Sequence, residues 1–266
     1  MNNKIAVLGA KGFVGSNLVR HLSKHNIVFP VTRATIDLLD ADQVAELLKE
    51  QQFDIVINAA AVMTDNIAVT DTRNNLGIFM NFYHNRKYFK KFINLASGAE
   101  YDRSKNIEDA EEETIANCLP TDSYGFGQNM KSRISAETPG FYNLRIFNCF
   151  GKGEPNTRIF PKLLTDTLDG FAISNDRYFD YFCIQDLCTV VEHFVNNTEL
   201  VYDVNCVYKS KYKISEVAKM FLTLHKIDKE IVIESTSDNN YTGSGTKLAA
   251  LELPLLGLVQ GLKNYE

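Results

Sequence analysis

The chain has 266 residues, of which 45% are hydrophobic and 23% charged, so it is long enough to bury a large core as one or two domains. Its net charge of −5 argues against a nucleic-acid partner, and no apolar stretch is long enough to span a bilayer, so we expect no membrane partner. The five cysteines form no CxxC pair and no cluster with histidine, which argues against disulfides and against a metal site. Because the polar first residues are no secretory signal, we expect a cytoplasmic protein.

Strand-like and helical segments alternate along the chain. Short apolar runs, as expected of strands buried on both faces, cover residues 4–8, 27–31, 54–58, 91–96 and 142–147. Helical spacing covers residues 16–22, 42–49, 128–136, 159–168, 184–196 and 214–224. This alternation predicts an α/β fold with a doubly wound parallel Rossmann sheet. We expect this sheet domain to comprise residues 1–149 and 176–204, with a small interleaved C-terminal substrate-binding domain, the cap, formed by residues 150–175 and 205–266.

The first strand runs directly into a glycine pattern of the form GxxGxxG. Gly9 permits the tight strand-to-helix turn, Gly12 lets backbone N–H groups approach a pyrophosphate, and Gly15 lets the helix pack close to the strand. An ordinary glycine-rich turn is the alternative, but the position between a strand and a helix favours a dinucleotide site with the anion at the helix N-terminus. The residues that we expect around the pyrophosphate are Gly9, Lys11, Gly12, Phe13, Val14 and Gly15.

The end of the second strand indicates which cofactor is preferred. An acidic residue there would bind the ribose hydroxyls of NAD, but this strand is followed by Arg33. Together with Lys11, Arg33 would clamp a 2′-phosphate, which favours NADP while leaving NAD open; the alternative is two solvated surface charges. Further residues expected at the cofactor are Asp37 and Leu38 beside the adenine, and Ala59, Ala60 and Ala61, whose small side chains fit either a bound cofactor or helix packing.

Seven ordered segments carry a resemblance to a known family. They are GAKGFVG at 9–15, Arg33 before IDLLD at 36–40, DIVINAAA at 54–61, NLASGAEY at 94–101, SYGFGQ at 123–128, LRIFNCFG at 144–151 and DYFCIQDL at 180–187. With them, the chain resembles the extended short-chain dehydrogenase/reductases of the NAD-dependent epimerase/dehydratase family, especially the GDP-L-fucose synthase and dTDP-4-keto-sugar reductase branch. The resemblance implies an NAD(P)-binding Rossmann domain, a cap that binds a nucleotide sugar, and a homodimer formed through the helix with the catalytic tyrosine.

The same resemblance implies catalytic roles for Ser97 and Tyr124. In such a site the phenol exchanges a proton with a sugar hydroxyl or ketone, the serine hydroxyl holds the same oxygen, and nicotinamide C4 exchanges the hydride. By family position, Phe147 and Asn148 lie near the nicotinamide, and Asn148 also near the substrate. Read without the resemblance, Ser97 would be a turn residue, Tyr124 an aromatic at a helix start, and Asn148 a turn former.

One catalytic position departs from the family pattern: the lysine of YxxxK is Gln128. A unit charge ~5 Å away at an effective dielectric of about 20 is worth roughly 3 kcal/mol, or about two pKa units. Without that charge we expect Tyr124 to stay protonated, which suits proton donation to a ketone better than oxidation of an alcohol. Lys131, a further turn along the same face, is the remaining candidate to replace the lysine.

Other departures narrow the reaction. Gly98 and Ala99 stand where dehydratases carry an Asp–Glu pair, and Ala99 and Arg158 stand where fucose synthases carry a cysteine and a histidine for epimerisation at C3 and C5. Three functions remain: reduction of a 4-keto sugar nucleotide, 4-epimerisation of a nucleotide sugar, or a catalytically impaired NADP-binding regulatory role.

The cations Arg158, Lys162 and Arg177 are expected to bind the substrate diphosphate. The alternative is that they are solvated surface charges.

Overall fold

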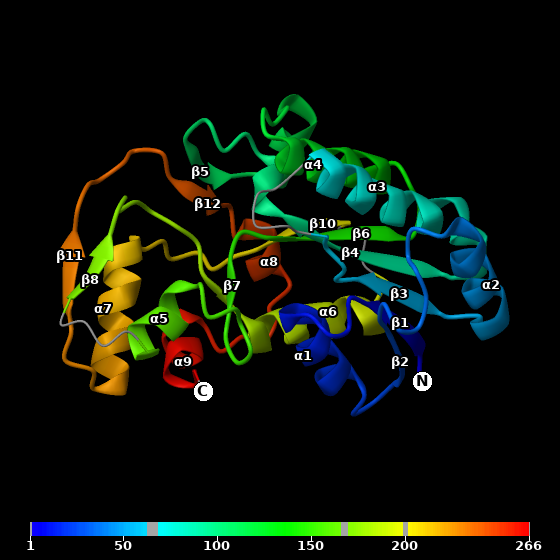
Figure 1. Cartoon of the computed structure of the whole chain (residues 1–266), viewed down its shortest axis with the longest axis horizontal. Helices are drawn as coiled ribbons and strands as arrows, with labels where there is room; N and C mark the ends of the chain where they lie inside the picture. The colour runs from blue at the N-terminus through cyan, green and yellow to red at the C-terminus, as the bar shows by residue number, and fades with distance from the viewer. Residues whose placement is uncertain (1, 63–68, 166–169, 199–201, 266) are drawn as a thin grey trace.

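A six-stranded parallel sheet lies at the centre of the computed structural model, which describes residues 2–62, 69–165, 170–198 and 202–265 (Figure 1). Its strand order is β10-β6-β4-β3-β1-β2. The bounds are β1 Lys4–Leu8, β2 Ile27–Val31, β3 Ile55–Asn58, β4 Lys91–Ser97, β6 Phe141–Ile146 and β10 Asp203–Cys206. The five strands expected from the sequence are therefore confirmed. The short strand β10 was missed because its sequence mixes polar and apolar residues.

Helices cover both faces of this sheet, as a doubly wound fold requires (Figure 1). Along β1, Ile5 and Val7 point to one buried cluster while Ala6 and Leu8 point to the other, since successive side chains alternate between the faces. One face carries α1 Phe13–Leu22, α6 Ile184–Asn196 and α8 Thr246–Ala250. The opposite face carries α2 Ala41–Gln51, α3 Val69–His84 and α4 Ser123–Ala136.

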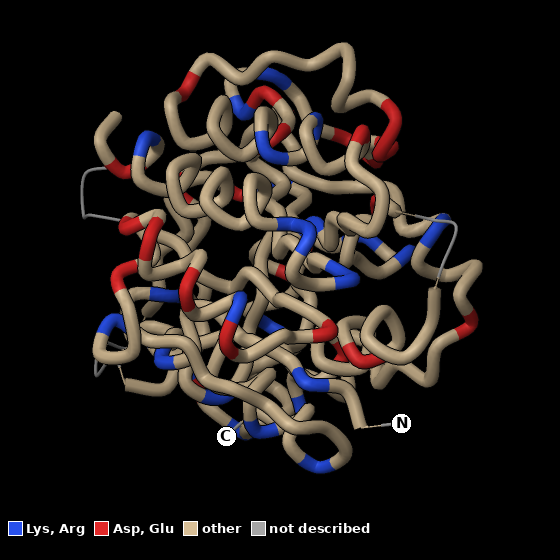
Figure 2. The backbone as a smooth tube through the Cα atoms, turned by 90° about the vertical axis from the view of Figure 1, so that its right-hand side faces the viewer, with Lys and Arg blue, Asp and Glu red and all other residues tan. Residues whose placement is uncertain are grey.

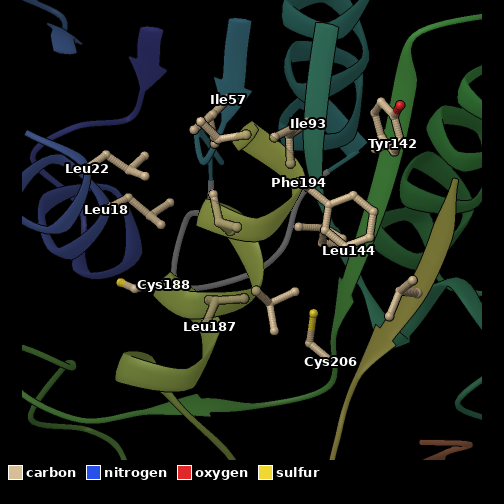
Figure 3. Packing of buried hydrophobic residues seen from close by; sticks show 14 of the residues in the cluster. Leu18, Leu22, Ile57, Ile93, Tyr142, Leu144, Leu187, Cys188, Phe194 and Cys206 are labelled. Atoms are coloured by element: carbon tan, nitrogen blue, oxygen red, sulfur yellow. The ribbon is translucent and has the colours of Figure 1, made fainter. Parts of the chain in front are cut away.

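Helix α6 is the main partner of α1 on its face of the sheet. Figure 3 shows Phe194 of α6 beside Leu144 of β6, with Leu18 of α1 on the other side of α6, and all three side chains are fully buried. Burying a side chain of this size stabilises the fold by about 1.5–3 kcal/mol. This packing holds α1 and α6 against the sheet, next to the loop that follows β1.

The cap lies beyond one end of the sheet (Figure 1). Its core gathers Phe150, Phe160 and Phe221 in a separate buried cluster. The helices expected at 159–168 and 214–224 are found as α5 and α7, although residues 166–168 lie outside the described ones. The cap elements are α5 Ile159–Thr165, α7 Ile214–His225, α9 Leu258–Lys263 and the strand pair β8 Gly170–Ile173 with β11 Glu230–Ile233.

Short elements connect the sheet to the cap. They are the strand pairs β7 Cys149–Phe150 with β9 Phe182–Cys183 and β5 Ile107–Ala110 with β12 Tyr241–Gly243, and the 3-10 helices η2 Gly98–Glu100 and η3 Glu112–Asn117. A further 3-10 helix, η1 Arg86–Tyr88, lies within the sheet domain between α3 and β4. The chain leaves the sheet after β6 and returns to it for α6 and β10.

Helix α4 begins at Ser123 rather than at residue 128, where helical spacing becomes visible in the sequence. Asp122 caps the helix by accepting a hydrogen bond from the Gly125 N–H at 2.8 Å. A Cβ on Gly125 would lie 2.4 Å from the Ala99 carbonyl oxygen, and one on Gly127 would lie 2.6 Å from a methyl carbon of Thr72. Gly125 and Gly127 weaken the helical pattern in the sequence, but they let the helix pack tightly.

Three buried asparagines form a hydrogen-bonded row across the sheet. Asn58, Asn94 and Asn143 stand in register on β3, β4 and β6. The Asn58 amide donates to the Asn94 side-chain oxygen at 3.1 Å, and the Asn94 amide donates to that of Asn143 at 3.3 Å. The Asn143 amide in turn donates to the Ser132 carbonyl on α4 at 3.2 Å. The row satisfies these buried amides and ties β3 to α4.

Candidate functional site

The loops after β1 and β3 meet at the point where the strand order reverses. Gly9 has φ +70°, and a Cβ there would lie 2.7 Å from the Ala59 carbonyl oxygen. A Cβ on Gly15 would lie 2.2 Å from the Gly9 carbonyl oxygen, so neither position has room for a side chain. Helix α1 begins after Gly12 without a side-chain cap. Its first N–H groups, among them those of Phe13 and Val14, therefore lack a side-chain cap at the carboxyl edge of the sheet, where a helix N-terminus is suited to bind an anion.

The cations expected at the cofactor flank this loop. The Ala10 N–H donates to the Val31 carbonyl at 3.2 Å, which places the glycine loop beside the end of β2, shortly before Arg33. Lys11 and Arg33 both have exposed side chains. This arrangement leaves both charges accessible to a phosphate at this edge.

The remaining cofactor candidates surround the same edge. Asp37 is exposed, and its carboxylate accepts a hydrogen bond from the Leu39 N–H at 2.9 Å. Leu38 and Ala60 pack against the buried cluster beneath α2 and α3, whereas Ala61 is exposed. Small side chains therefore line the turn after β3.

Ser97, Tyr124 and Gln128 come together at the same end of the sheet. Ser97 ends β4, whereas Tyr124 and Gln128 lie one turn apart on α4. Burial raises the pKa of Tyr124, and the side chains of Ser97 and Gln128, which face the phenol, lower that pKa by less. Tyr124 is therefore protonated at neutral pH, as a proton donor must be.

The turn after β4 holds Ser97 in place. The Ser97 N–H donates to Glu100 Oε1 at 3.2 Å, and the Ser97 Oγ accepts a hydrogen bond from the Ala99 N–H at 3.2 Å. Glu100 is itself buried and bound by Arg145 of β6, with 2.7 Å between Oε2 and Nε. A buried ion pair thus supports the turn that carries the serine.

Arg103 is a cation near Tyr124 that sequence reasoning missed. Its guanidinium carbon lies 5.8 Å from the centre of the Tyr124 ring, and its Nη2 lies 2.8 Å from the carboxylate of Asp122. The charge of Arg103 is among the influences that lower the Tyr124 pKa, although burial outweighs it. No spacing in the sequence points to Arg103, because it lies in the loop after η2.

Lys131, the candidate to replace the absent lysine, interacts electrostatically with Glu100. It is buried on α4, and burial lowers the pKa of its ammonium to about 8, an effect that the charge of Glu100 opposes. The electrostatic partner of Lys131 is therefore Glu100.

The candidates for substrate binding do not all lie together: Asn148 and Arg158 contact each other near the glycine loop, whereas Arg177 lies apart from them. Arg158 Nη1 donates to the Asn148 side-chain oxygen at 3.0 Å, and its guanidinium carbon lies 6.0 Å from the centre of the Phe13 ring. Arg177 lies elsewhere, since its Nη1 donates to the Asn239 carbonyl at 2.9 Å and its guanidinium carbon lies 5.5 Å from the centre of the Phe179 ring. Lys162 lies one turn beyond Arg158 on α5 with an exposed side chain.

Phe147 precedes Asn148 in the chain, but its side chain points away from Asn148 and Arg158. Its ring packs between those of Tyr101 and Tyr241, with centres 5.8 Å and 4.9 Å apart. The side chain is 7% exposed, so the ring belongs to a buried cluster next to Asn148.

Charge is spread over the molecule. Figure 2 shows acidic and basic residues interspersed along the described chain, without a continuous basic band. Within the described ranges, histidine, cysteine and acidic residues form no group of three able to hold a metal ion. None of the described helices combines the length and apolar character needed to cross a membrane.

Comparison with known proteins adds independent evidence. A family model described as "NAD dependent epimerase/dehydratase family" matches residues 5–204. A GDP-mannoheptose C4 reductase from Campylobacter jejuni with NADP bound is 22% identical, with 99% of this chain and 96% of that chain covered at a TM-score of 0.82. A dTDP-4-dehydrorhamnose reductase from Bacillus anthracis in complex with NADP is 14% identical, with coverage of 100% and 99% and a TM-score of 0.83. A GDP-L-fucose synthetase from Naegleria fowleri bound to NADP is 16% identical, with coverage of 98% and 91% and a TM-score of 0.84.

Proposed function

Because the chain belongs to the NAD-dependent epimerase/dehydratase family, we propose that it reduces a 4-keto sugar nucleotide to the alcohol with NADPH. The observation that carries this proposal is that Ser97 and Tyr124, a phenol whose pKa burial raises, come together at the carboxyl edge of the sheet, the edge on which the glycine loop also lies. A neutral phenol is suited to donate a proton to a ketone oxygen. The missing lysine at Gln128 favours this direction over initial oxidation.

We assign the cofactor site to the edge formed by β1, β2 and β3. Lys11 and Arg33 would bind the 2′-phosphate of NADP, and the first N–H groups of α1 would bind the pyrophosphate. The fit rests on the absence of room for any side chain at Gly9 and Gly15. The structurally similar proteins with NADP bound support this choice over NAD.

The chemistry follows from the positions of two hydroxyl groups. Bound NADPH supplies the hydride that adds to the carbonyl carbon. Tyr124 gives its proton to the carbonyl oxygen, and the Ser97 hydroxyl donates a hydrogen bond to that oxygen as negative charge develops on it. Glu100 holds the Ser97 backbone, so the hydroxyl is positioned before the substrate binds.

We assign the sugar-nucleotide site to the boundary between sheet and cap. Asn148 and Arg158 face the glycine-loop side, and Arg177 and Lys162 add positive charge for a diphosphate. In this proposal residues 1–149 and 176–204 bind the cofactor, and the cap of residues 150–175 and 205–266 binds the substrate, although the end of β10 and helix α8 within the second range pack with the sheet.

We further propose a homodimer formed through α4 in the cytoplasm. Phe126 projects from the exposed side of α4 with 40% of its surface accessible, which suits a helix-to-helix contact. The five cysteines are all unpaired thiols, which suits a reducing compartment.

The decisive experiment is product analysis after mixing the protein, deuterium-labelled NADPH and a panel of 4-keto-6-deoxy nucleotide sugars. We expect one deuterium per product molecule at C4. Tyr124→Phe is expected to slow reduction by about 100- to 10,000-fold, as for loss of a positioned acid. Tyr88→Phe, on η1 outside the site, is the matched control and should keep the wild-type rate. A product without deuterium, or an active Tyr124→Phe variant, would contradict the proposal.

The position of Arg103 favours 4-epimerisation as the second candidate. Its charge acts to lower the Tyr124 pKa and would assist transient oxidation. An epimerase would interconvert two alcohols without incorporating deuterium from added NADPH. A regulatory protein would bind NADPH and turn over neither substrate.

A further inference from the structure

A second tyrosine reaches the proposed active site from the C-terminal part of the chain. Tyr241 begins β12, beyond the range 5–204 that the family model matches. Its hydroxyl oxygen lies 2.6 Å from the point that a Cβ on Gly98 would occupy, directly beside Ser97 in the chain. Burial raises the pKa of Tyr241, and the Ser97 side chain faces this phenol and lowers its pKa, as it does for Tyr124. Tyr241 and Tyr124 therefore both lie near the turn that carries Ser97.

The ring of Tyr241 is fixed by its surroundings. It is 7% exposed and packs between Phe147 and Phe179, whose ring centres lie 4.9 Å and 5.2 Å away. Its N–H donates to the Tyr178 carbonyl at 2.9 Å, and its carbonyl accepts from the Asp180 N–H at 3.1 Å. Both the ring and the backbone thus fix the hydroxyl beside Gly98, next to Ser97 in the chain.

Lys211 and Asp180 fasten the strand that carries this tyrosine. The Lys211 ammonium donates to Asp180 Oδ1 at 3.0 Å and to the Gly243 carbonyl at 2.6 Å. The Gly243 N–H donates to Asp180 Oδ2 at 2.8 Å. This clamp fixes the strand on which Tyr241 lies.

A count of the hydrogen bonds at Ser97 shows what Tyr241 adds. A serine hydroxyl has one proton and two lone pairs, and the Ala99 N–H already occupies one lone pair at 3.2 Å. A Tyr241 O–H that donates to the second lone pair leaves the Ser97 proton to be donated elsewhere. Tyr124, the other group facing Ser97, marks the side on which the substrate oxygen would lie.

We propose that Tyr241 is a positioning residue that donates a hydrogen bond to Ser97 Oγ and thereby directs the Ser97 proton toward the keto oxygen beside Tyr124. This inference rests on the proposed reduction. It assigns a role in the reaction to the C-terminal segment, which contributes a side chain behind the catalytic serine and not on the substrate side.

The test is Tyr241→Phe, which keeps the ring packing and removes the hydroxyl. We expect kcat for reduction to fall about 10- to 100-fold, while KM, the Kd of NADPH and the urea midpoint stay near wild type. Tyr101→Phe is the matched control, since Tyr101 packs on the other side of Phe147 and its hydroxyl donates to the Glu111 carbonyl at 3.0 Å. An unchanged kcat in Tyr241→Phe, or an equal loss in Tyr101→Phe, overturns the proposal.

A double-mutant cycle with Ser97→Ala separates positioning from packing. If Tyr241 acts through Ser97, adding Tyr241→Phe to Ser97→Ala causes no further loss of kcat. Losses that multiply show an independent role and overturn the proposal.

A structural readout covers the case in which the wild type reduces no 4-keto sugar nucleotide, which would overturn the proposed function. Crystal structures of the wild type and Tyr241→Phe then compare the Ser97 side chain. A changed Ser97 rotamer supports positioning, and an unchanged rotamer overturns it.

Discussion

The Nε of Arg145 lies 2.7 Å from Oε2 of Glu100, and neither side chain has any exposed surface. Burial raises the pKa of Glu100, whereas the charge of Arg145 opposes that rise. The second oxygen of Glu100 accepts the Ser97 N–H, so the pair links β6 to the turn of the proposed catalytic serine. Arg145 Nη2 also lies 3.0 Å from Asp203 Oδ1, a partly exposed carboxylate, so removing Arg145 would strip the fully buried Glu100 of its ion pair.

We therefore expect Arg145→Met to lower the free energy of unfolding by about 3–5 kcal/mol. The double variant Arg145→Met with Glu100→Gln should recover part of that loss, because the buried Glu100 side chain is then neutral while an acceptor for the Ser97 N–H remains. Asp203, the other carboxylate that Arg145 binds, is 23% exposed and keeps contact with water. Urea denaturation of the wild type and the variants measures both effects. Equal destabilisation of the single and double variants would assign the loss to packing instead of charge.

Lys131 predicts a pH dependence of stability above neutrality. Burial lowers its pKa to about 8 from the ordinary 10.5, so the unfolded chain binds more protons than the folded one between these values. The contribution of Lys131 to the unfolding free energy therefore rises with pH across that window. The destabilisation caused by burying its ammonium is fully present below pH 8. We expect the stability advantage of Lys131→Met over wild type to shrink by about 2–3 kcal/mol from pH 7 to pH 10.

Urea denaturation of both proteins at matched pH values measures this difference. The subtraction removes the titration of other groups that the two proteins share. A stability difference that does not change with pH would show that Lys131 keeps an ordinary pKa in the folded protein.

Arg33→Ala tests cofactor preference. We expect it to weaken NADPH binding by roughly 1–3 kcal/mol while changing NADH binding little, because only NADPH carries the 2′-phosphate. Fluorescence titration with both nucleotides measures the two affinities. Lys24→Ala, an exposed cation beyond the end of α1, is the control and should change neither. Equal losses of affinity for both nucleotides would show that Arg33 does not bind the 2′-phosphate.

Gln128→Lys tests the electrostatic argument about Tyr124. The added ammonium should lower the Tyr124 pKa by about two units and improve alcohol oxidation more than ketone reduction at neutral pH. The measurement is the pH dependence of both directions in wild type and variant. If the wild type already oxidises alcohol with a basic limb near pH 7, Arg103 or another group activates Tyr124 and the missing lysine is not decisive.

The sequence by itself determined the parallel sheet and the place of the glycine loop, because both depend on local patterns. Apolar runs of strand length predicted β1, β2, β3, β4 and β6, and the spacing of Gly9, Gly12 and Gly15 predicted a turn that tolerates no side chain. Helix α4 was found only in part, since Gly125 and Gly127 weaken the helical signal and become favourable only through close packing.

Tertiary structure alone decided which distant residues meet. Asn58 and Asn143 are linked through Asn94 because strand register aligns them, and no sequence pattern specifies that register. Arg103 and Tyr241 reach Tyr124 and Ser97 from a loop and from the C-terminal segment, whose positions depend on long-range packing. Burial, which raises the Tyr124 pKa, is likewise a property of the folded chain, because it depends on every element that packs around the phenol.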